Sequence, residues 1–327
     1  MNTINERVAA HQKQIEKAIQ SLALPGQPSR LYEPIRYFMS LGGKRMRPVM
    51  CMLAYEMYRE DVEQAIPAAL ALELFHNFTL LHDDIMDLAP VRRGKATVHV
   101  KWNNDIAILS GDALYVLAYQ QLQAVRPEVL PQVMRVFNRV ALEVCEGQQY
   151  DMDFQSRDAV SLEEYLQMIR LKTSVLLGGS LEIGVLLAGG SAREAHLAYT
   201  FGEKVGLAFQ IHDDLLDAYG NPESFGKKPG GDILVNKHTF LRMAAEALAT
   251  GDQVKALKQA YALQEEEGKV ESVKAIFDSL GVPQKAELKK QELLEVAFDA
   301  LNQMTEAKQS IREELKALAF YLIEREA

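Results

Sequence analysis

The sequence predicts an all-α protein, and three observations carry that prediction. Ala, Leu, Glu, Gln and Met, which are strong helix formers, are abundant. Apolar residues recur at helical spacing almost throughout the chain, as at Leu70, Leu74, Phe78 and Leu81. The alternating pattern that is typical of a strand never extends beyond a few residues.

The breaks between the periodic segments are short, which divides the chain into about a dozen expected helices. The apolar residues Val133, Phe137, Val140 and Val144 form the stripe of one long helix. Pro48 suits the first turn of another. The expected helices are Asn5–Leu22, Arg30–Leu41, Pro48–Arg59, Val62–Leu88, Ile106–Ala124, Leu130–Phe154, Ser161–Leu187, Ala192–Ala218, Lys237–Ala249, Gln253–Glu267, Lys269–Leu280 and Gln284–Phe320. Because no linker-like segment separates them, we expect a single domain over residues 1–327.

The composition excludes several classes of protein. Hydrophobic residues make up 48% and charged residues 25%, which excludes disorder over most of the chain. A net charge of −9 argues against a general nucleic-acid binder, which needs a basic excess. Cys51 and Cys145 are too few for a disulfide framework and fit a reducing compartment. Since no run of 18 apolar residues occurs, we expect a cytoplasmic protein without stable membrane insertion.

Two aspartate-rich motifs predict a metal site. Residues 81–87 read L-H-D-D-I-M-D, and residues 211–217 read I-H-D-D-L-L-D. On a helix, such a spacing crowds three carboxylates onto one face, where they repel one another. The apolar flanks argue against a solvated acidic face, so we expect a hard divalent cation to compensate. The predicted ligands are Asp83, Asp84, Asp87, Asp213, Asp214 and Asp217.

Basic residues near these motifs predict a phosphorylated substrate. Mg²⁺ prefers few carboxylates, several waters and the oxygens of substrate phosphates. Residues 41–48 read L-G-G-K-R-M-R-P, in which glycines allow the backbone close to an anion and Lys44, Arg45 and Arg47 supply donors. Basic clusters also follow each aspartate motif, at 92–95 and at 226–237. Each cluster alone would be solvated loop charge, but its position next to a metal motif favours diphosphate binding.

Taken together, the motifs resemble those of one enzyme family. The segments G-G-K-R-M-R-P, D-D-I-M-D followed by R-R-G, and F-Q-I-H-D-D-L-L-D followed by G-K-K-P-G-G-D are similar to those of the trans-isoprenyl diphosphate synthases. The resemblance is to the polyprenyl synthetases of short-chain type, such as farnesyl and geranylgeranyl diphosphate synthases. It implies a large bundle of antiparallel helices around a deep central cavity, two or three Mg²⁺ ions and a homodimer.

The resemblance also implies roles for individual residues. The binders of isopentenyl diphosphate would be Lys44, Arg47, His76 and Arg93. The binders of the allylic diphosphate would be Arg92, Lys172, Thr173, Gln210, Lys227 and Lys237. The catalytic set would be Asp83, Asp87, Lys172, Thr173, Gln210 and Asp213. One departure is Asn236, which stands where the family often has glycine.

The implied activity is the Mg²⁺-dependent, head-to-tail condensation of isopentenyl diphosphate with dimethylallyl, geranyl or farnesyl diphosphate. Phe78 and Thr79, just before the first motif, resemble the residues that limit the product to C15–C20. Three alternatives stay open: a synthase of medium or long chains, a terpene cyclase, and a non-catalytic partner subunit of a synthase. The G-G-K-R-M-R-P segment disfavours the cyclase, and the presence of all six aspartates disfavours the silent subunit.

Overall fold

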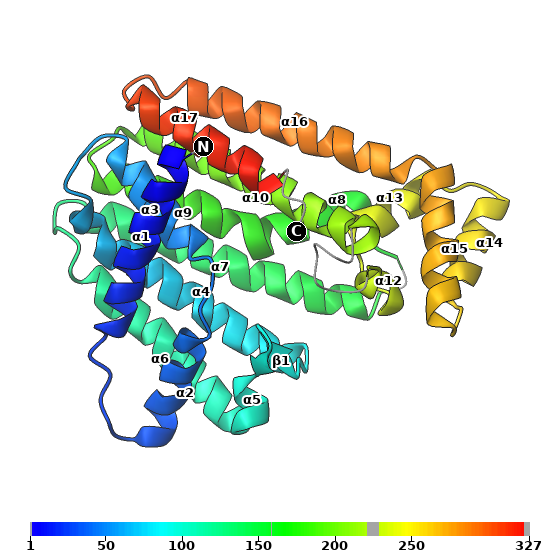
Figure 1. Cartoon of the computed structure of the whole chain (residues 1–327), viewed down its shortest axis with the longest axis horizontal. Coiled ribbons are helices and arrows are strands. Elements are labelled where there is room, and N and C mark those ends of the chain that lie inside the picture. Colours follow the sequence, from blue (N-terminus) through cyan, green and yellow to red (C-terminus); the bar gives the residue numbers. More distant parts are fainter. Residues whose placement is uncertain (1, 158, 221–228, 324–327) are drawn as a thin grey trace. The chain divides into compact units, whose positions relative to one another are not determined.

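The computed structural model describes residues 2–157, 159–220 and 229–323, and most of them are helical (Figure 1). The predicted all-α class is confirmed. Backbone contacts divide the chain into two compact units. The described residues of unit 1 lie within Met1–Ala141, Gly179–Tyr199 and Met304–Leu315, and those of unit 2 lie within Leu142–Gly178, Thr200–Gln303 and Lys316–Ala327. The single domain and the central cavity stay predictions.

Unit 1 contains the first half of the chain. Its elements are α1 (Asn2–Gln20), α2 (Ser29–Ser40), α3 (Met46–Glu56), the 3₁₀ turn η1 (Val62–Ala65), α4 (Ile66–Met86), the strands β1 (Val91–Arg92) and β2 (Lys95–Ala96), α5 (Val98–Lys101) and α6 (Asn104–Leu122). The most extensive helix pair is α4 with α6, which lie side by side (Figure 1). Much of α4 is buried, so this helix forms the centre of the core of unit 1.

A glycine sets the spacing of that helix pair. A Cβ atom on Gly111 of α6 would lie 2.2 Å from Nε2 of His82 on α4. A side chain at this position would displace the His82 ring from its contact with α6.

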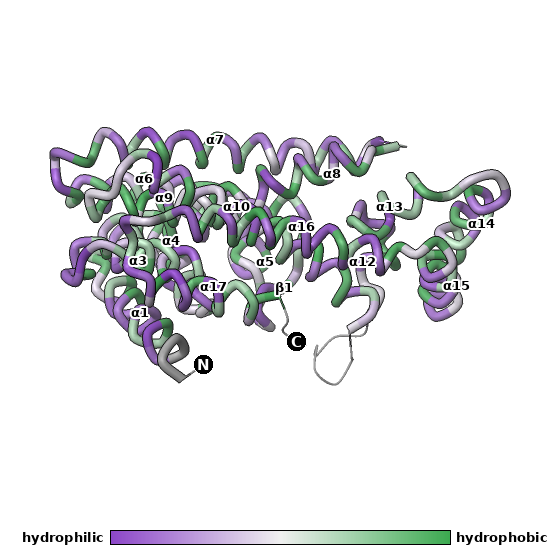
Figure 2. Tube along the Cα trace, turned by 90° about the horizontal axis from the view of Figure 1, so that it is seen from above, coloured by the Kyte–Doolittle hydropathy of each residue, from purple (hydrophilic) through white to green (hydrophobic). Residues whose placement is uncertain are grey.

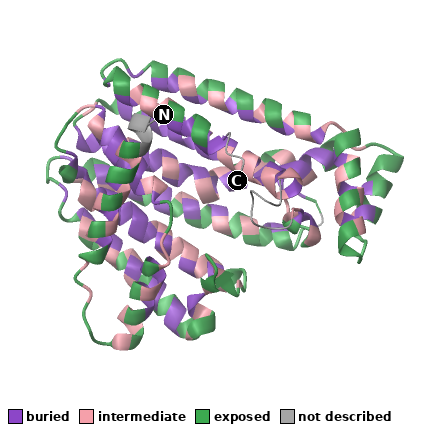
Figure 3. Cartoon of the chain, viewed as in Figure 1, coloured by how far each residue is buried: buried purple, intermediate pink, exposed green. Residues whose placement is uncertain are grey.

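Unit 2 contains most of the second half. Its own helices are α8 (Leu162–Ile169), the π-helical segment η2 (Arg170–Ser174), α12 (Gly231–Leu234), α13 (Phe240–Leu248), α14 (Asp252–Tyr261), α15 (Glu266–Ser279) and α16 (Val282–Asn302). Residues of α7 (Leu130–Gln155), α9 (Val175–Leu187), α10 (Ala192–Tyr219) and α17 (Gln309–Ile323) belong to both units. Hydrophobic and hydrophilic residues alternate along α7 (Figure 2), and most residues of α14 are exposed (Figure 3).

Several expected boundaries were wrong. The helix expected over Gln284–Phe320 is two helices, because the chain between α16 and α17 is held by tertiary contacts. Met304 is fully buried there, and the Lys308 N–H donates to the Met57 carbonyl over 2.9 Å. The helix expected over Gln253–Glu267 ends at Tyr261, and the one expected over Val62–Leu88 begins as a 3₁₀ turn.

Candidate active site

The first aspartate motif lies at the carboxyl end of α4. Asp83 and Asp84 are in the last turn of the helix, and Asp87 caps it. The helix dipole disfavours negative charge at this end, so the motif needs a compensating cation. Within the protein, Arg92 supplies one: its Nε donates to both carboxylate oxygens of Asp84, over 2.8 and 2.9 Å. Burial raises the pKa of Asp84, and the Arg92 guanidinium opposes that rise.

The short hairpin of β1 and β2 returns Arg92 to the helix end. Its turn uses positive φ angles of 52° at Arg93 and 73° at Gly94. The Thr97 hydroxyl donates to the Ala89 carbonyl over 2.7 Å, which ties the end of the hairpin to the chain just beyond α4. The hairpin thus places two successive arginines beside the motif.

The glycine-rich loop between α2 and α3 packs against the second of these arginines. Gly42 and Gly43 have φ angles of 77° and 145°, which glycine adopts readily. A Cβ atom on Gly43 would lie 2.9–3.0 Å from the Arg93 guanidinium, so the backbone approaches this cation closely. An open pocket of about 650 Å³ adjoins this contact, and Arg93, Lys95 and Lys101 are among its lining residues.

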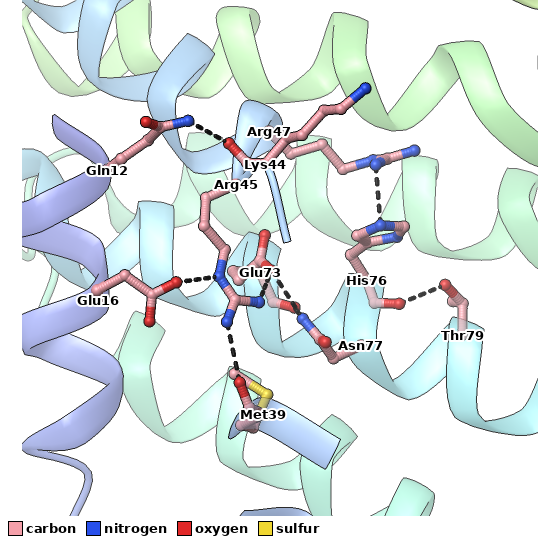
Figure 4. A network of polar contacts seen from close by, with 10 residues as sticks. All are labelled: Gln12, Glu16, Met39, Lys44, Arg45, Arg47, Glu73, His76, Asn77 and Thr79. Carbon is pink, nitrogen blue, oxygen red and sulfur yellow. Dashed lines mark hydrogen bonds and ion pairs between the residues drawn. The ribbon is translucent and has the colours of Figure 1, made fainter. Parts of the chain in front are cut away.

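Arg47 and His76 meet beside this loop (Figure 4). Arg47 Nη1 lies 2.9 Å from His76 Nε2. Burial and the nearby Arg47 and Arg93 hold the pKa of His76 well below its usual range, so the imidazole is neutral and accepts from Arg47. Burial lowers the pKa of Arg47 to about 10, which still leaves it charged near neutral pH. Arg47 Nε has no hydrogen-bond partner, so the guanidinium keeps donor capacity for an anion.

Phe78 and Thr79 point to different partners. The Phe78 ring stacks on Tyr115 of α6, with centroids 5.1 Å apart, and meets the edge of His82 at 4.8 Å. The Thr79 hydroxyl donates to the His76 carbonyl over 2.8 Å. Phe78 therefore belongs to an aromatic cluster between α4 and α6.

The second aspartate motif occupies the last two turns of α10, again at the carboxyl end of a helix. Asp214 is buried, and its Oδ2 accepts from the Tyr165 hydroxyl over 2.6 Å and from the Phe240 N–H over 2.8 Å. Burial raises the pKa of Asp214 to about 6. Asp213 and Asp217 are partly exposed, and Asp217 Oδ2 accepts from the Asp232 N–H over 2.9 Å. Gln210 Nε2 lies 3.4 Å from Asp214 Oδ1.

Lys172 and Thr173 lie in the π-helical segment η2. Such segments occur frequently at functional sites. The backbone there is closely packed, since a Cβ atom on Gly147 of α7 would lie 2.2 Å from the Lys172 nitrogen. The Lys172 ammonium donates to Asp151 Oδ2 over 2.6 Å. The π-helical turn therefore presents Lys172 to α7.

The segment after the second motif is described from residue 229 onward. The Lys237 ammonium lies 3.2 Å from Asp232 Oδ1, and Asp232 and Asp214 raise the pKa of Lys237 against the effect of burial. Asn236 has a φ of 56°, a left-handed conformation that asparagine tolerates better than most residues. Asn236 thus suits a position where the family often has glycine. Lys227 lies outside the described residues.

The donor set at both motifs fits a hard cation, because it consists of carboxylate oxygens at helix ends that disfavour negative charge. Among the described residues, no three His, Cys, Asp or Glu side chains are already grouped as a metal cage. Mg²⁺ keeps several waters and takes oxygens from a phosphorylated substrate. The residues present therefore fit Mg²⁺ bound together with substrate.

Comparisons with known proteins identify the family. The model of the family "Polyprenyl synthetase" matches residues 28–280. The chain is 38% identical to a geranylgeranyl pyrophosphate synthase of Geoglobus acetivorans over 325 residues, which cover 99% of both chains. The chain belongs to the polyprenyl synthetase family. The resemblance predicted from the motifs is confirmed.

Other polyprenyl synthetases agree with this assignment. The chain is 41% identical to a geranylgeranyl diphosphate synthase of Methanosarcina mazei over 241 residues, 73% of this chain and 74% of the relative. The crystal structure of geranylgeranyl pyrophosphate synthetase from Pyrococcus horikoshii superposes with a TM-score of 0.91 at 32% identity, covering 98% of this chain and 99% of the other. None of the helices, within the described residues, is long and apolar enough to cross a membrane.

The sequence missed several residues of these sites in the polyprenyl synthetase. Tyr165 and Asp151 hold Asp214 and Lys172, but neither stands in one of the singled-out motifs. Gly147 lies inside a long helix, and a glycine at such a position can indicate close packing against another segment. It could therefore have drawn attention to the neighbourhood of Asp151. The expectation that Arg45 offers donors to an anion was wrong: its side chain is 1% exposed and pairs with two carboxylates.

Proposed function

We propose that this polyprenyl synthetase catalyses the Mg²⁺-dependent, head-to-tail condensation of isopentenyl diphosphate with an allylic diphosphate. The observation that carries the proposal is the pairing, in each unit, of an aspartate-rich helix end with cationic side chains. Arg92 holds Asp84 in unit 1, and Lys237 pairs with Asp232 beside Asp217 in unit 2. Relatives named as geranylgeranyl diphosphate synthases over most of their length support the same reaction.

Isopentenyl diphosphate would bind in unit 1, at Lys44, Arg47, His76 and Arg93. Support comes from the unused donor of Arg47 and from the lowered pKa values of Arg47, His76 and Arg93. For Arg93 the causes are burial and repulsion by Arg45 and Arg92. An anion would relieve that repulsion and accept charge-assisted hydrogen bonds.

The binders of the allylic diphosphate would be Arg92, Lys172, Thr173, Gln210, Lys227 and Lys237. Lys172 and Lys237 each lie beside a carboxylate, Asp151 and Asp232, which orients their ammonium groups. These side chains would bind the diphosphate group, and the apolar isoprenoid part of the substrate would extend toward hydrophobic residues.

Mg²⁺, in two or three ions, would bind at the two aspartate motifs and would draw negative charge off the allylic diphosphate. Asp83, Asp87, Asp213 and Asp217 are the more accessible members. Asp84 and Asp214 are 2% and 3% exposed and already accept short hydrogen bonds. We assign these two chiefly to orienting the others, with ligation left to the accessible four.

The side chains of this protein would contribute to catalysis by positioning the substrates and by stabilising charge. The C–O bond of the allylic diphosphate breaks, the isopentenyl double bond attacks the resulting cation, and a proton leaves the new adduct toward the released diphosphate. Lys172 and Arg92 stabilise the leaving oxygens, while Thr173 and Gln210 offer neutral oxygen dipoles to the cation. Exclusion of water by apolar packing protects the cation from quenching.

The product would be a C15–C20 diphosphate. Phe78 would limit its length, with Thr79 beside it, and the stacking of Phe78 on Tyr115 supports a rigid barrier at that point. Relatives named for the C20 product favour geranylgeranyl diphosphate.

The active form would be a cytoplasmic homodimer. Leu109 and Val116 of α6 are 59% and 57% exposed and, being seven residues apart, share one helix face. A second copy of this chain would cover that apolar face, since isolated exposed leucines are common but a stripe on one helix is not.

The two diphosphate subsites are tested by substituting one cation in each. Arg47→Ala should raise the Michaelis constant for isopentenyl diphosphate, and Lys237→Ala that for the allylic substrate. Each variant loses a charge-assisted contact of about 1.5–3 kcal/mol, which corresponds to a change of roughly 10- to 150-fold. Steady-state kinetics with each substrate varied in turn decides the matter. If both variants weakened the same substrate equally, the assignment of the subsites would be wrong.

A further inference from the structure

Arg45 is the centre of a polar network beneath the glycine-rich loop (Figure 4). Its backbone has a φ of 50°, so the chain turns at this residue between Lys44 and Arg47. The turn directs the side chain inward, where its Nη1 donates to Glu73 Oε1 over 2.7 Å and its Nη2 to the Met39 carbonyl over 2.9 Å. Lys44 and Arg47 are thereby separated by a residue that is fixed to the core.

The carboxylate that receives Arg45 is itself fixed. Glu73 is 3% exposed, and Asn77 one turn later donates to its Oε1 over 2.8 Å and to its carbonyl over 2.7 Å. Glu73 lies three residues before His76 on α4, so it shares the helix that carries the partner of Arg47. The Arg45–Glu73 ion pair therefore fixes the loop relative to His76.

The N-terminal helix α1 holds the same loop from the other side. Glu16 Oε1 accepts from Arg45 Nε over 2.8 Å, and the Gln12 amide donates to the Lys44 carbonyl over 2.7 Å (Figure 4). Gln12 and Glu16 are four residues apart and lie on one face of α1. One helix face thus contacts two successive residues of the loop, one through its backbone and one through its side chain.

The charges show why this arrangement matters to an anion site. Arg45 pairs with the buried Glu73 and the partly exposed Glu16, so the trio carries a net charge of −1 next to Lys44, Arg47 and Arg93. That charge offsets part of the mutual repulsion of three cations, which must stay close together before any diphosphate arrives. Gln12 and Glu16 are not among the residues proposed to bind the diphosphate.

We infer that Gln12 and Glu16 of α1, acting through the Lys44 carbonyl and Arg45, are positioning residues that set the affinity for isopentenyl diphosphate. The family match begins at residue 28, so it does not include this helix. The inference rests on the proposed function, because it concerns the subsite formed by Lys44, Arg47, His76 and Arg93. It adds that α1 completes the subsite without touching the substrate.

The test uses Gln12→Ala and Glu16→Gln, with Gln20→Ala, an exposed glutamine at the end of α1, as the matched control. The Glu16 side chain is 38% exposed, so its substitution leaves the core intact. Arg45→Ala is unsuitable, because it would leave Glu16 and Glu73 without their arginine and destabilise unit 1. Isothermal titration calorimetry would measure the dissociation constant of isopentenyl diphosphate, and kinetics would give the Michaelis constants and kcat. Circular dichroism would follow thermal unfolding.

We expect both variants to weaken isopentenyl diphosphate by about three- to tenfold, in binding and in Michaelis constant, because a misplaced donor loses part of a charge-assisted contact. The Michaelis constant for the allylic diphosphate and kcat should stay within twofold, and Gln20→Ala should match the wild type.

Normal affinity for isopentenyl diphosphate in both variants would overturn the inference alone. Equal loss in every parameter, with a lowered unfolding temperature, would also overturn it, since that indicates general destabilisation. A wild-type protein that neither binds nor elongates isopentenyl diphosphate would overturn the proposed function as well.

Discussion

The middle aspartates of the two motifs share one environment at the level of single residues. Asp84 and Asp214 are both buried, and each accepts hydrogen bonds from a side chain of another element, Arg92 and Tyr165. Their neighbours Asp83 and Asp213 are more accessible. The repeat seen in the sequence is therefore also a repeat of environment: the middle aspartate of each motif is buried and bonded to another element, and its neighbours are more exposed.

Asp83→Ala and Asp87→Ala should each reduce turnover by at least about a hundredfold without unfolding the protein. The substitution removes one of several carboxylates at a helix end that disfavours them, so the thermal stability of the metal-free protein should hold or rise. Activity assays and thermal unfolding in a chelator measure the two effects. Normal activity with a large loss of stability would show that these carboxylates are structural.

The raised pKa of Asp214 makes a prediction about pH. Its carboxyl has an ordinary pKa of 3.8 and a folded pKa of about 6, so protonation favours the folded state. This contribution to stability is fully present below pH 3.8 and is lost as the pH rises through 6. Asp214→Asn keeps an oxygen for Tyr165 and Phe240 but no charge. It should be more stable than the wild type at pH 7, by at most about 3 kcal/mol, with the difference shrinking toward pH 4.

Urea unfolding of the metal-free protein at pH 4, 5.5 and 7 measures that difference. Asp299→Asn, at an exposed position of α16, is the control for the loss of one carboxylate. If the free-energy difference between Asp214→Asn and the wild type were the same at all three pH values, the carboxyl would not titrate as described.

At the level of elements, short irregular segments position the cations. The hairpin brings Arg92 to the end of α4, the π-helical segment presents Lys172, and the glycine-rich loop carries Lys44 and Arg47. The hairpin and the glycine-rich loop use backbone angles that favour glycine, such as the φ of 73° at Gly94 and of 145° at Gly43.

Gly43→Ala should weaken isopentenyl diphosphate by about tenfold or more, because the new methyl group would meet the Arg93 guanidinium and the backbone angle would be strained. Gly26→Ala is the matched control, since nothing lies within 4 Å of its added Cβ atom. Calorimetric titration of both variants gives the comparison. An unaffected Gly43→Ala protein would mean that the contact between the loop and Arg93 has no part in binding.

The sequence predicted those helices whose positions follow from the regular spacing of apolar residues. The long helices and the two aspartate motifs follow from spacing alone, as α4 and α10 confirm. The break at Met304, the hairpin and the π-helical segment could not be predicted, because tertiary contacts determine them. The inward turn of Arg45 was missed for the same reason: Glu16 and Glu73 lie far from it in the sequence.

At the level of the whole molecule, the proposed limit on product length rests on aromatic packing inside unit 1. The stacked pair of Phe78 and Tyr115 joins α4 to α6, and Tyr119 continues the cluster at 5.1 Å from Tyr115. An aromatic wall of this kind would resist displacement by a growing chain, since its rings are packed on several sides.

Phe78→Ala should shift the products to longer chains by removing that wall. The variant should remain folded, because the Phe78 ring is only partly buried and its loss should cost less than the roughly 3–5 kcal/mol of a fully buried ring. Chromatography of the dephosphorylated products measures chain length. An unchanged product from a folded and active variant would refute the role of Phe78 as the limit of the cavity.

The central claim is that this chain alone elongates an allylic diphosphate with isopentenyl diphosphate. The most direct measurement incubates the purified protein with labelled isopentenyl diphosphate and dimethylallyl, geranyl or farnesyl diphosphate in turn, with Mg²⁺ or with a chelator. We predict Mg²⁺-dependent incorporation of label into a C15–C20 product, with one diphosphate released per condensation. Diphosphate release without incorporation of label, or incorporation only after a second protein is added, would contradict the account.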